Sequence, residues 1–176
     1  MLNRLNLPHK YLKASKNLEF INFNGGTWID AGCGEGAYSI PLSFFVERVI
    51  AVDENVNSLN RLKKILTTSK INNITVKNFN FNNNLKTLGD NFFGILFAFS
   101  LHYQQEISHL LEESLELIKK HKGKIIIIEY ERQIPVPWVP FPWNYEKVRN
   151  EIFDTGFLES ELIFSNDRYF ILEAKI

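Results

Sequence analysis

Short apolar runs alternate with amphipathic segments along most of the chain. The runs hold few polar positions, which is typical of strands that are covered on both faces of a parallel sheet. The amphipathic segments place apolar residues three or four positions apart, as in a helix that packs on one side. The predicted strands are 27–31, 48–52, 73–79, 92–100 and 124–130, and the predicted helices are 36–46, 55–69, 105–121 and 144–156. Asn55 is the expected N-cap of the second helix.

The two ends of the chain depart from this alternation. Residues 11–23 are expected to form a helix that stops at the turn signal Asn24-Gly25-Gly26. Residues 157–176 are expected to form two strands joined at 165–167, whereas 78–91 shows no periodicity and is expected to be a connection. The order predicts an α/β fold: a doubly wound, mostly parallel seven-stranded sheet with helices on both faces and an antiparallel C-terminal hairpin.

Length and composition point to one ordinary globular domain. The 176 residues are 45% hydrophobic and 23% charged, and no linker or repeat divides them. We therefore expect a single domain over 1–176, with an N-terminal helical segment at 1–24 and a core at 25–176. Lysine plus arginine (20) equals aspartate plus glutamate (20), so a nucleic-acid partner is not favoured.

The same sequence gives expectations about compartment. No apolar stretch approaches the ~20 residues that span a bilayer, and the N-terminus lacks the apolar core of a signal peptide. Cys33 is the only cysteine, so no intrachain disulfide can form and a reducing compartment is expected. These features predict a cytoplasmic protein without a membrane partner.

The glycine-rich stretch 28–39, "WIDAGCGEGAYS", follows the first predicted strand. Gly32, Gly34 and Ala37 satisfy the loose dinucleotide pattern G-x-G-x-x-G/A, which is weak by itself. Asp30 shifts the balance, because a carboxylate at the strand end would repel a pyrophosphate at the helix N-terminus. It suits a ligand with an ammonium and a sulfonium group. S-adenosylmethionine has both and carries no phosphate, and Asp53 could accept hydrogen bonds from its ribose hydroxyls.

Two motifs carry a family resemblance. "WIDAGCGEG" followed by "VIAVDEN" resembles the class I S-adenosylmethionine-dependent methyltransferase family. The likeness continues through "NFFGILFAFSLHYQ", "KIIIIEYE" and the final hairpin, and so covers nearly the whole chain after the first helix. It implies the fold, S-adenosylmethionine as methyl donor and methyl transfer, but it gives no acceptor.

The resemblance also implies a set of cofactor-binding residues. The glycines and Asp30 would line the methionine pocket, Asp53 would hold the ribose, and Glu54 would lie at the adenine edge. Where the family often has an acid for the adenine amino group, this chain has Asn80, although Asn78 fits too and the register within 78–84 stays open. The set is Asp30, Gly32, Gly34, Gly36, Asp53, Glu54, Asn80, Phe81 and Ala98.

The acceptor side is less explicit. His102 and Tyr103 follow the fourth predicted strand and are the catalytic candidates: His102 could accept a proton from the acceptor and Tyr103 could orient it. The alternative is that His102 caps the strand and bonds a backbone carbonyl. The strand does not lead into an (Asn/Asp)-Pro-Pro-(Tyr/Phe) motif, which disfavours exocyclic base amines as acceptors.

A proline-rich passage after the fifth strand supplies the substrate-binding candidates. Its four prolines stiffen the backbone and its aromatic residues offer flat apolar surface, so it could form one wall of the acceptor site. The alternative is a rigid loop packed on the core. Glu129 and Glu131 alternate at the strand end, so that one could face the acceptor and the other solvent. The candidates are Glu129, Glu131, Trp138 and Trp143.

These observations favour an S-adenosylmethionine-dependent methyltransferase acting on an unidentified acceptor, with a small molecule ahead of a macromolecule. An RNA or protein methyltransferase that works with a partner, or a non-catalytic cofactor-binding subunit, is the alternative. A nicotinamide-dependent oxidoreductase is disfavoured by Asp30 and by the missing second domain. No metal site is expected, because the four histidines are scattered and Cys33 stands alone.

Overall fold

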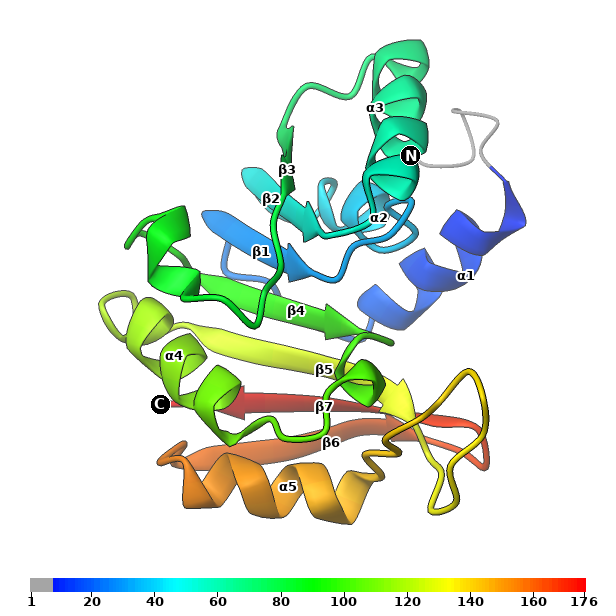
Figure 1. The fold of residues 1–176 in the computed structure, drawn as a ribbon. Helices are drawn as coiled ribbons and strands as arrows, with labels where there is room; N and C mark the ends of the chain where they lie inside the picture. The colour runs from blue at the N-terminus through cyan, green and yellow to red at the C-terminus, as the bar shows by residue number, and fades with distance from the viewer. Residues whose placement is uncertain (1–7) are drawn as a thin grey trace.

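A seven-stranded mixed sheet runs through the centre of the protein (Figure 1). The computed structural model describes residues 8–176 and gives the strand order β3-β2-β1-β4-β5-β7-β6. The strands are β1 (Thr27–Ala31), β2 (Arg48–Asp53), β3 (Ile74–Asn78), β4 (Gly94–Ala98), β5 (Lys124–Tyr130), β6 (Glu159–Ser165) and β7 (Tyr169–Lys175). The first five are mutually parallel, and β7 pairs antiparallel with both β5 and β6. The predicted fold class is confirmed.

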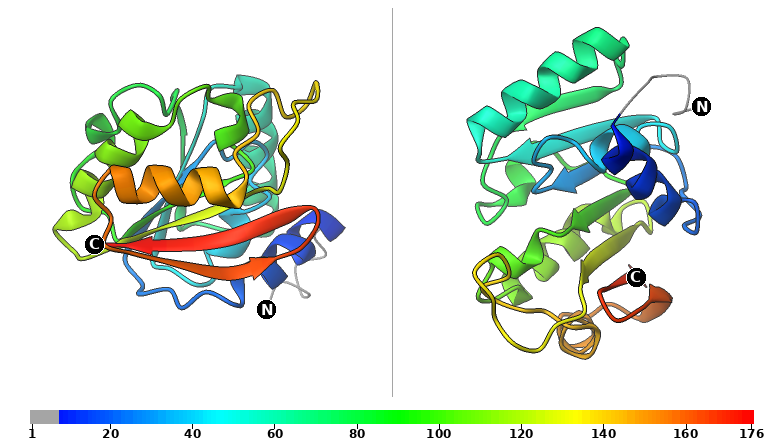
Figure 2. Two further views of the ribbon diagram at one scale, coloured as in Figure 1. Left: turned by 90° about the horizontal axis from the view of Figure 1, so that it is seen from below. Right: turned by 90° about the vertical axis from the view of Figure 1, so that its right-hand side faces the viewer.

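Helices cover both faces of the sheet, as the views in Figure 2 show. They are α1 (His9–Leu18), α2 (Ser39–Leu42), α3 (Val56–Ser69), α4 (Ser108–Lys119) and α5 (Tyr145–Asp154), with the short 3-10 helices η2 (Leu85–Leu88) and η3 (Leu101–Tyr103). The buried side chains of α1, α2 and α3 pack on one face, and those of η2, α4 and α5 pack on the other. Within residues 8–176, every helix is too short or too polar to cross a membrane.

The isoleucine run of β5 explains why this strand lies inside the sheet. Ile125 and Ile127 belong to the core under α4 and α5, whereas Ile126 and Ile128 belong to the core under the other helices. All four are fully buried. Because successive side chains of a strand point to opposite faces, only a strand covered on both sides can bury such a run.

Two predicted helices are shorter than expected. The segment 36–46 contains only the single turn α2, because the amides of Phe44 and Phe45 bond three residues back and so end the α-helical pattern. Its apolar residues are nevertheless buried as predicted, including Ile40 and Leu42. The N-terminal helix ends at Leu18 instead of reaching residue 23, and residues 1–7 of the predicted segment 1–24 lie outside the described residues.

The cap and the asparagine-rich connection behave largely as predicted. The Asn55 side chain accepts a hydrogen bond from the Ser58 amide at 3.1 Å, which confirms it as the N-cap of α3. The connection after β3 contains only the 3-10 turn η2, whose cap Asn84 accepts from the Lys86 amide. This connection is therefore irregular, but side chains within it hydrogen-bond its own backbone.

The strand order reverses between β1 and β4. From β1 the sheet continues to β2 and β3 on one side, and from β4 it continues to β5 on the other. The loops that leave β1 and β4 at their carboxyl ends therefore run in opposite directions. A crevice forms between such loops, and it is the usual place for a ligand in a doubly wound sheet.

Candidate functional site

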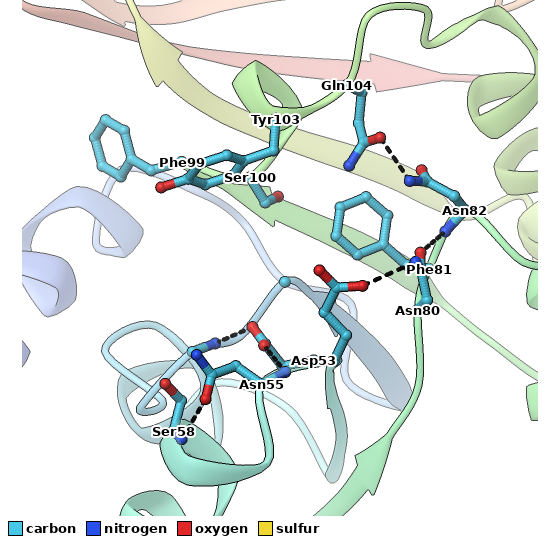
Figure 3. A pocket seen from close by; sticks show the side chains of 13 residues that line it. Asp53, Asn55, Ser58, Asn80, Phe81, Asn82, Phe99, Ser100, Tyr103 and Gln104 are labelled. Carbon is cyan, nitrogen blue, oxygen red and sulfur yellow. Dashed lines mark hydrogen bonds between the residues drawn. The ribbon is translucent and has the colours of Figure 1, made fainter. Parts of the chain in front are cut away.

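A cavity of about 510 Å³ lies at the carboxyl ends of the first four strands (Figure 3). Most of the lining residues lie at the end of one of these strands or within a few residues after it. The lining residues are Gly32, Gly34, Asp53, Glu54, Asn55, Ser58, Asn80, Phe81, Asn82, Phe99, Ser100, Tyr103 and Gln104. The cavity thus lies where the strand order reverses.

The glycine loop brings its backbone close to the cavity. Gly32 and Gly34 have φ values of +79° and +53°, which favour glycine. A Cβ atom on Gly32 would lie 2.6 Å from the Cβ of Ser100, whereas one on Gly34 would meet nothing within 4 Å. Gly36 has a different task, because a Cβ there would collide with the Leu62 side chain of α3. Gly36 therefore packs the loop on α3 and does not line the cavity.

Asp53, the last residue of β2, ties the glycine loop to the start of α3. One carboxylate oxygen accepts the Gly34 amide at 2.8 Å, and the other accepts the Asn55 amide at 2.7 Å. A carboxylate has about four acceptor positions, so each oxygen keeps capacity for a further donor. Because Asp53 lines the cavity, this capacity is available to a ligand with paired hydroxyl groups.

A chain of amide groups forms the opposite wall, as the dashed lines in Figure 3 show. The Asn80 side-chain amide donates to Glu54 at 2.9 Å, and its carbonyl accepts the Asn82 amide at 2.9 Å. Asn82 in turn donates to Gln104 at 2.6 Å. Asn78 does not line the cavity and instead donates to the backbone carbonyls of Asp53 and Glu54. Of the two asparagines left open by the sequence, Asn80 therefore lines the cavity.

Asp30 lies within the protein rather than on the cavity wall. It is 1% exposed, and its carboxylate accepts a hydrogen bond from the Ser39 hydroxyl at the start of α2. Burial, with a smaller contribution from the charge of Asp53, raises the pKa of Asp30 to about 7, although the Ser39 hydrogen bond opposes the rise. The expectation that Asp30 itself lines the pocket is thus not met by the geometry. Asp30 instead bonds Ser39 at the far end of the glycine-rich stretch, inside the protein.

The raised pKa of Asp30 predicts how the free energy of unfolding depends on pH. Between pH 4 and 7 the folded protein keeps a proton on Asp30 that the unfolded chain releases, so stability should fall as the pH rises through this window. A shift from 3.8 to about 7 corresponds to about 4 kcal/mol in all. Asp30→Asn should remove this slope. Urea unfolding at pH 5, 6, 7 and 8 measures it, and parallel pH profiles for the two proteins would contradict the assignment.

His102 and Glu129 form a buried pair beside the cavity. Their side chains are 3% and 0% exposed, and His102 Nδ1 lies 2.9 Å from a Glu129 oxygen. Glu129 also accepts the backbone amides of His102 and Tyr130. Glu129 is therefore enclosed with His102 and does not line the cavity, contrary to its expected place on an acceptor wall. His102 bonds a carboxylate, and not the backbone carbonyl of the alternative interpretation.

The proline-rich passage is anchored to the segment that lines the cavity. The Phe141 amide donates to the His102 carbonyl at 3.1 Å, and the Trp143 indole donates to the Gln104 carbonyl at 2.8 Å. Trp138 stands 62% exposed at the tip of a turn closed by two bonds between Val136 and Val139. The passage is thus a rigid projection held at its base, and neither tryptophan is among the cavity residues.

The remaining predicted residues fall into two groups. Tyr103 lines the cavity and is 61% exposed, with its ring 4.2 Å from that of His102. Glu131 accepts the Tyr145 amide at the start of α5, and Ala98 ends β4 just before the cavity residues. Neither lines the cavity. Of the predicted cofactor residues, the cavity thus brings together Gly32, Gly34, Asp53, Glu54, Asn80 and Phe81.

Six lining residues were missed from the sequence: Asn55, Ser58, Asn82, Phe99, Ser100 and Gln104. Ser100 and Gln104 lie within the "SLHYQ" segment, so their place after a strand was a usable signal. Phe99 adopts φ +53°, rare for a bulky residue, which no sequence pattern indicates. Within residues 8–176, no three His, Cys, Asp or Glu side chains gather closely enough to hold a metal ion.

Several solved structures share the fold of this chain. A SAM-dependent methyltransferase from Aquifex aeolicus has a TM-score of 0.78 and 25% identity, covering 99% of this chain and 96% of its own. A putative S-adenosylmethionine-dependent methyltransferase from Listeria monocytogenes has a TM-score of 0.69 and 13% identity, covering 95% and 98%. The N-terminal domain of EvdMO1 with SAH bound has a TM-score of 0.70 and 15% identity, covering 94% and 80%.

Sequence comparison gives the family. No curated protein sequence matches the chain significantly. A family profile described as "Tellurite resistance protein TehB" matches residues 10–160, which include the glycine loop, the cavity and the proline-rich passage. The match covers most of the 176 residues. The chain therefore belongs to the TehB family and has the class I methyltransferase fold.

Proposed function

We propose that the protein is an S-adenosylmethionine-dependent methyltransferase that acts on a small, uncharged acceptor. The observation that carries this proposal is the position of Asp53 at the end of β2. Its carboxylate holds the Gly34 amide on one oxygen and the Asn55 amide on the other, and it lines the cavity with acceptor capacity to spare. A vicinal diol can donate both of its hydroxyl protons to such a carboxylate.

The charge of the cavity supports the same cofactor. Asp53 and Glu54 are its ionisable carboxylates, and no lysine or arginine is among its lining residues in the described chain. A pyrophosphate would meet two like charges there, whereas a donor with a sulfonium and an ammonium group is attracted. When bound, S-adenosylmethionine supplies an electrophilic methyl group on its sulfonium sulfur.

The lining residues divide between the parts of the donor. Asp53 would bind the ribose hydroxyls, and Glu54, Asn80 and Phe81 would enclose the adenine. Gly32 and Gly34 would let the backbone approach the methionine portion. Asp30, Gly36 and Ala98 support this arrangement from behind, through Ser39, Leu62 and the end of β4.

For the acceptor side we propose His102 as the general base and Tyr103 as the residue that orients the acceptor. With Glu129 accepting from Nδ1, that atom carries a proton and Nε2 is the ring nitrogen left to accept one from an acceptor. The proton leaving an acceptor hydroxyl or amine would go to Nε2. The rigid passage that carries Trp138 and Trp143 would border the acceptor, since its base is bonded to the His102 and Gln104 carbonyls.

The family description suggests a second acceptor, a tellurite-derived oxyanion. The lining residues do not favour it, because an anion would meet Asp53 and Glu54, and within residues 8–176 no lysine or arginine lines the cavity to compensate them. A panel of labelled methyl-transfer reactions with neutral phenols, amines and thiols, with tellurite as a separate arm, tests the two. We expect transfer to a neutral compound. Transfer to tellurite alone would contradict the proposed acceptor class while preserving methyl transfer.

We further propose that residues 1–176 act as one domain without a macromolecular acceptor. The zero net charge supports this, because a methyltransferase of RNA normally carries a basic surface. Donor binding without transfer to any compound in the panel would instead favour a cofactor-binding subunit that needs a partner. Addition of candidate RNA or protein acceptors to the same assay separates these cases.

A further inference from the structure

Ser100 lies at the cavity end of β4 with an unpartnered hydroxyl group. The residue is 3% exposed, and its Oγ atom is buried without a hydrogen-bond partner among residues 8–176. It is nevertheless one of the residues that line the cavity, and in Figure 3 its side chain lies between Tyr103 and Phe81. A buried polar group that faces a cavity without a protein partner is a candidate for contact with a ligand.

Other buried serines show that this is unusual in the protein. Ser39 donates to Asp30, Ser43 to the Ile40 carbonyl and Ser114 to the Leu110 carbonyl. The other buried serine hydroxyl without a partner in the described chain belongs to Ser160 of β6, which lies beside a different pocket. An unsatisfied buried group destabilises the free protein, so its persistence at the cavity needs a reason.

The position of Ser100 indicates which part of the donor it would contact. A Cβ atom on Gly32 would lie 3.3 Å from Ser100 Oγ, so the hydroxyl lies against the backbone of the first glycine. The ribose and adenine positions are accounted for by Asp53, Glu54 and Asn80. The Ser100 hydroxyl lies instead beside Gly32 and Tyr103, where the methionine portion of the donor would lie.

We propose that Ser100 is a donor-binding residue whose hydroxyl accepts a hydrogen bond from the ammonium group of the methionine portion. This inference rests on the proposed function. A hydrogen bond to a charged group is among the stronger ones, and it satisfies a group that the free protein leaves unpaired. Ser100 therefore improves donor binding at some cost to the stability of the free protein.

Ser100→Ala tests the proposed contact with the ammonium group by its different effects on two ligands. The affinity for S-adenosylhomocysteine, measured by calorimetry, should fall about 10- to 100-fold. The affinity for 5′-methylthioadenosine, which lacks the amino-acid portion, should stay within about twofold of wild type, because no hydrogen bond is lost. The melting temperature of the free protein should be unchanged or higher. Ser100→Cys should lose an intermediate amount, since a thiol is a weak hydrogen-bonding group.

Ser160→Ala is the matched control. It removes the other unpartnered buried hydroxyl, outside the cavity, and should leave both affinities unchanged. Equal binding of S-adenosylhomocysteine by wild type and Ser100→Ala would overturn the assignment of Ser100 while preserving the proposed function. Equal loss for both nucleosides, or a lower melting temperature, would also overturn it. If wild type binds neither nucleoside, the proposed function itself fails.

Discussion

Replacing Asp53 with alanine should lower the affinity for S-adenosylhomocysteine by about one to two orders of magnitude. The substitution removes charge-assisted hydrogen bonds to the ribose hydroxyls, which contribute about 1.5–3 kcal/mol. It also releases the Gly34 amide that Asp53 holds at 2.8 Å, so the glycine loop loses its bond to the end of β2. Both effects act in the same direction on binding. Calorimetric titration measures the loss.

Two further variants separate these effects. Asp53→Asn keeps the size and one carbonyl acceptor, so its affinity should lie between those of wild type and Asp53→Ala. Asp90→Ala removes an exposed carboxylate that is not among the cavity residues and should leave the affinity unchanged. Circular dichroism checks that each variant is folded. Wild-type affinity in folded Asp53→Ala would place the ribose elsewhere.

Replacing His102 with asparagine should lower turnover by about 10²–10⁴-fold while the donor affinity stays near wild type. The asparagine amide nitrogen takes the place of Nδ1 and can still donate to Glu129, which avoids leaving a buried carboxylate with one partner fewer. It cannot accept a proton in the way that the imidazole Nε2 does. Steady-state kinetics with the acceptor identified by the methyl-transfer panel measures this effect.

The choice of asparagine makes the result informative. If His102 only positions Tyr103 and Gln104 through its Nδ1 bond to Glu129, asparagine should preserve that task and turnover should stay near wild type. Tyr103→Phe is the companion variant, because it removes the phenol hydroxyl of a residue that lines the cavity. A loss of donor affinity in His102→Asn would contradict the acceptor-side role of His102.

The fold was largely predictable because its elements carry strong local signals. The four isoleucines of β5 can be buried only between two layers of helices, and the hairpin residues 165–167 mark where β6 turns into β7. The segment 36–46 was the main failure. Its apolar content suggested a long helix, but the amides of Phe44 and Phe45 bond three residues back, and burial alone does not require helical structure.

The site was predictable where it depends on strand ends and not where it depends on side-chain direction. Gly32, Asp53 and Asn80 line the cavity because the carboxyl ends of parallel strands meet at one edge. Glu129 also lies near the end of a strand, yet its side chain is buried, where it bonds the His102 ring and two backbone amides. The direction of such a side chain depends on partners distant in sequence. A spacing pattern does not contain that information.

Titration of the wild-type protein with S-adenosylhomocysteine and, separately, with NAD tests the central claim most directly. In the described part of the chain, Asp53 and Glu54 line the cavity without a lysine or arginine, which favours the ammonium group of the adenosyl compound and opposes a pyrophosphate. We expect one molecule of S-adenosylhomocysteine to bind per chain, and we expect NAD to produce no heat of binding. Binding of NAD without any binding of S-adenosylhomocysteine would contradict the assignment of the cavity as a methyl-donor site.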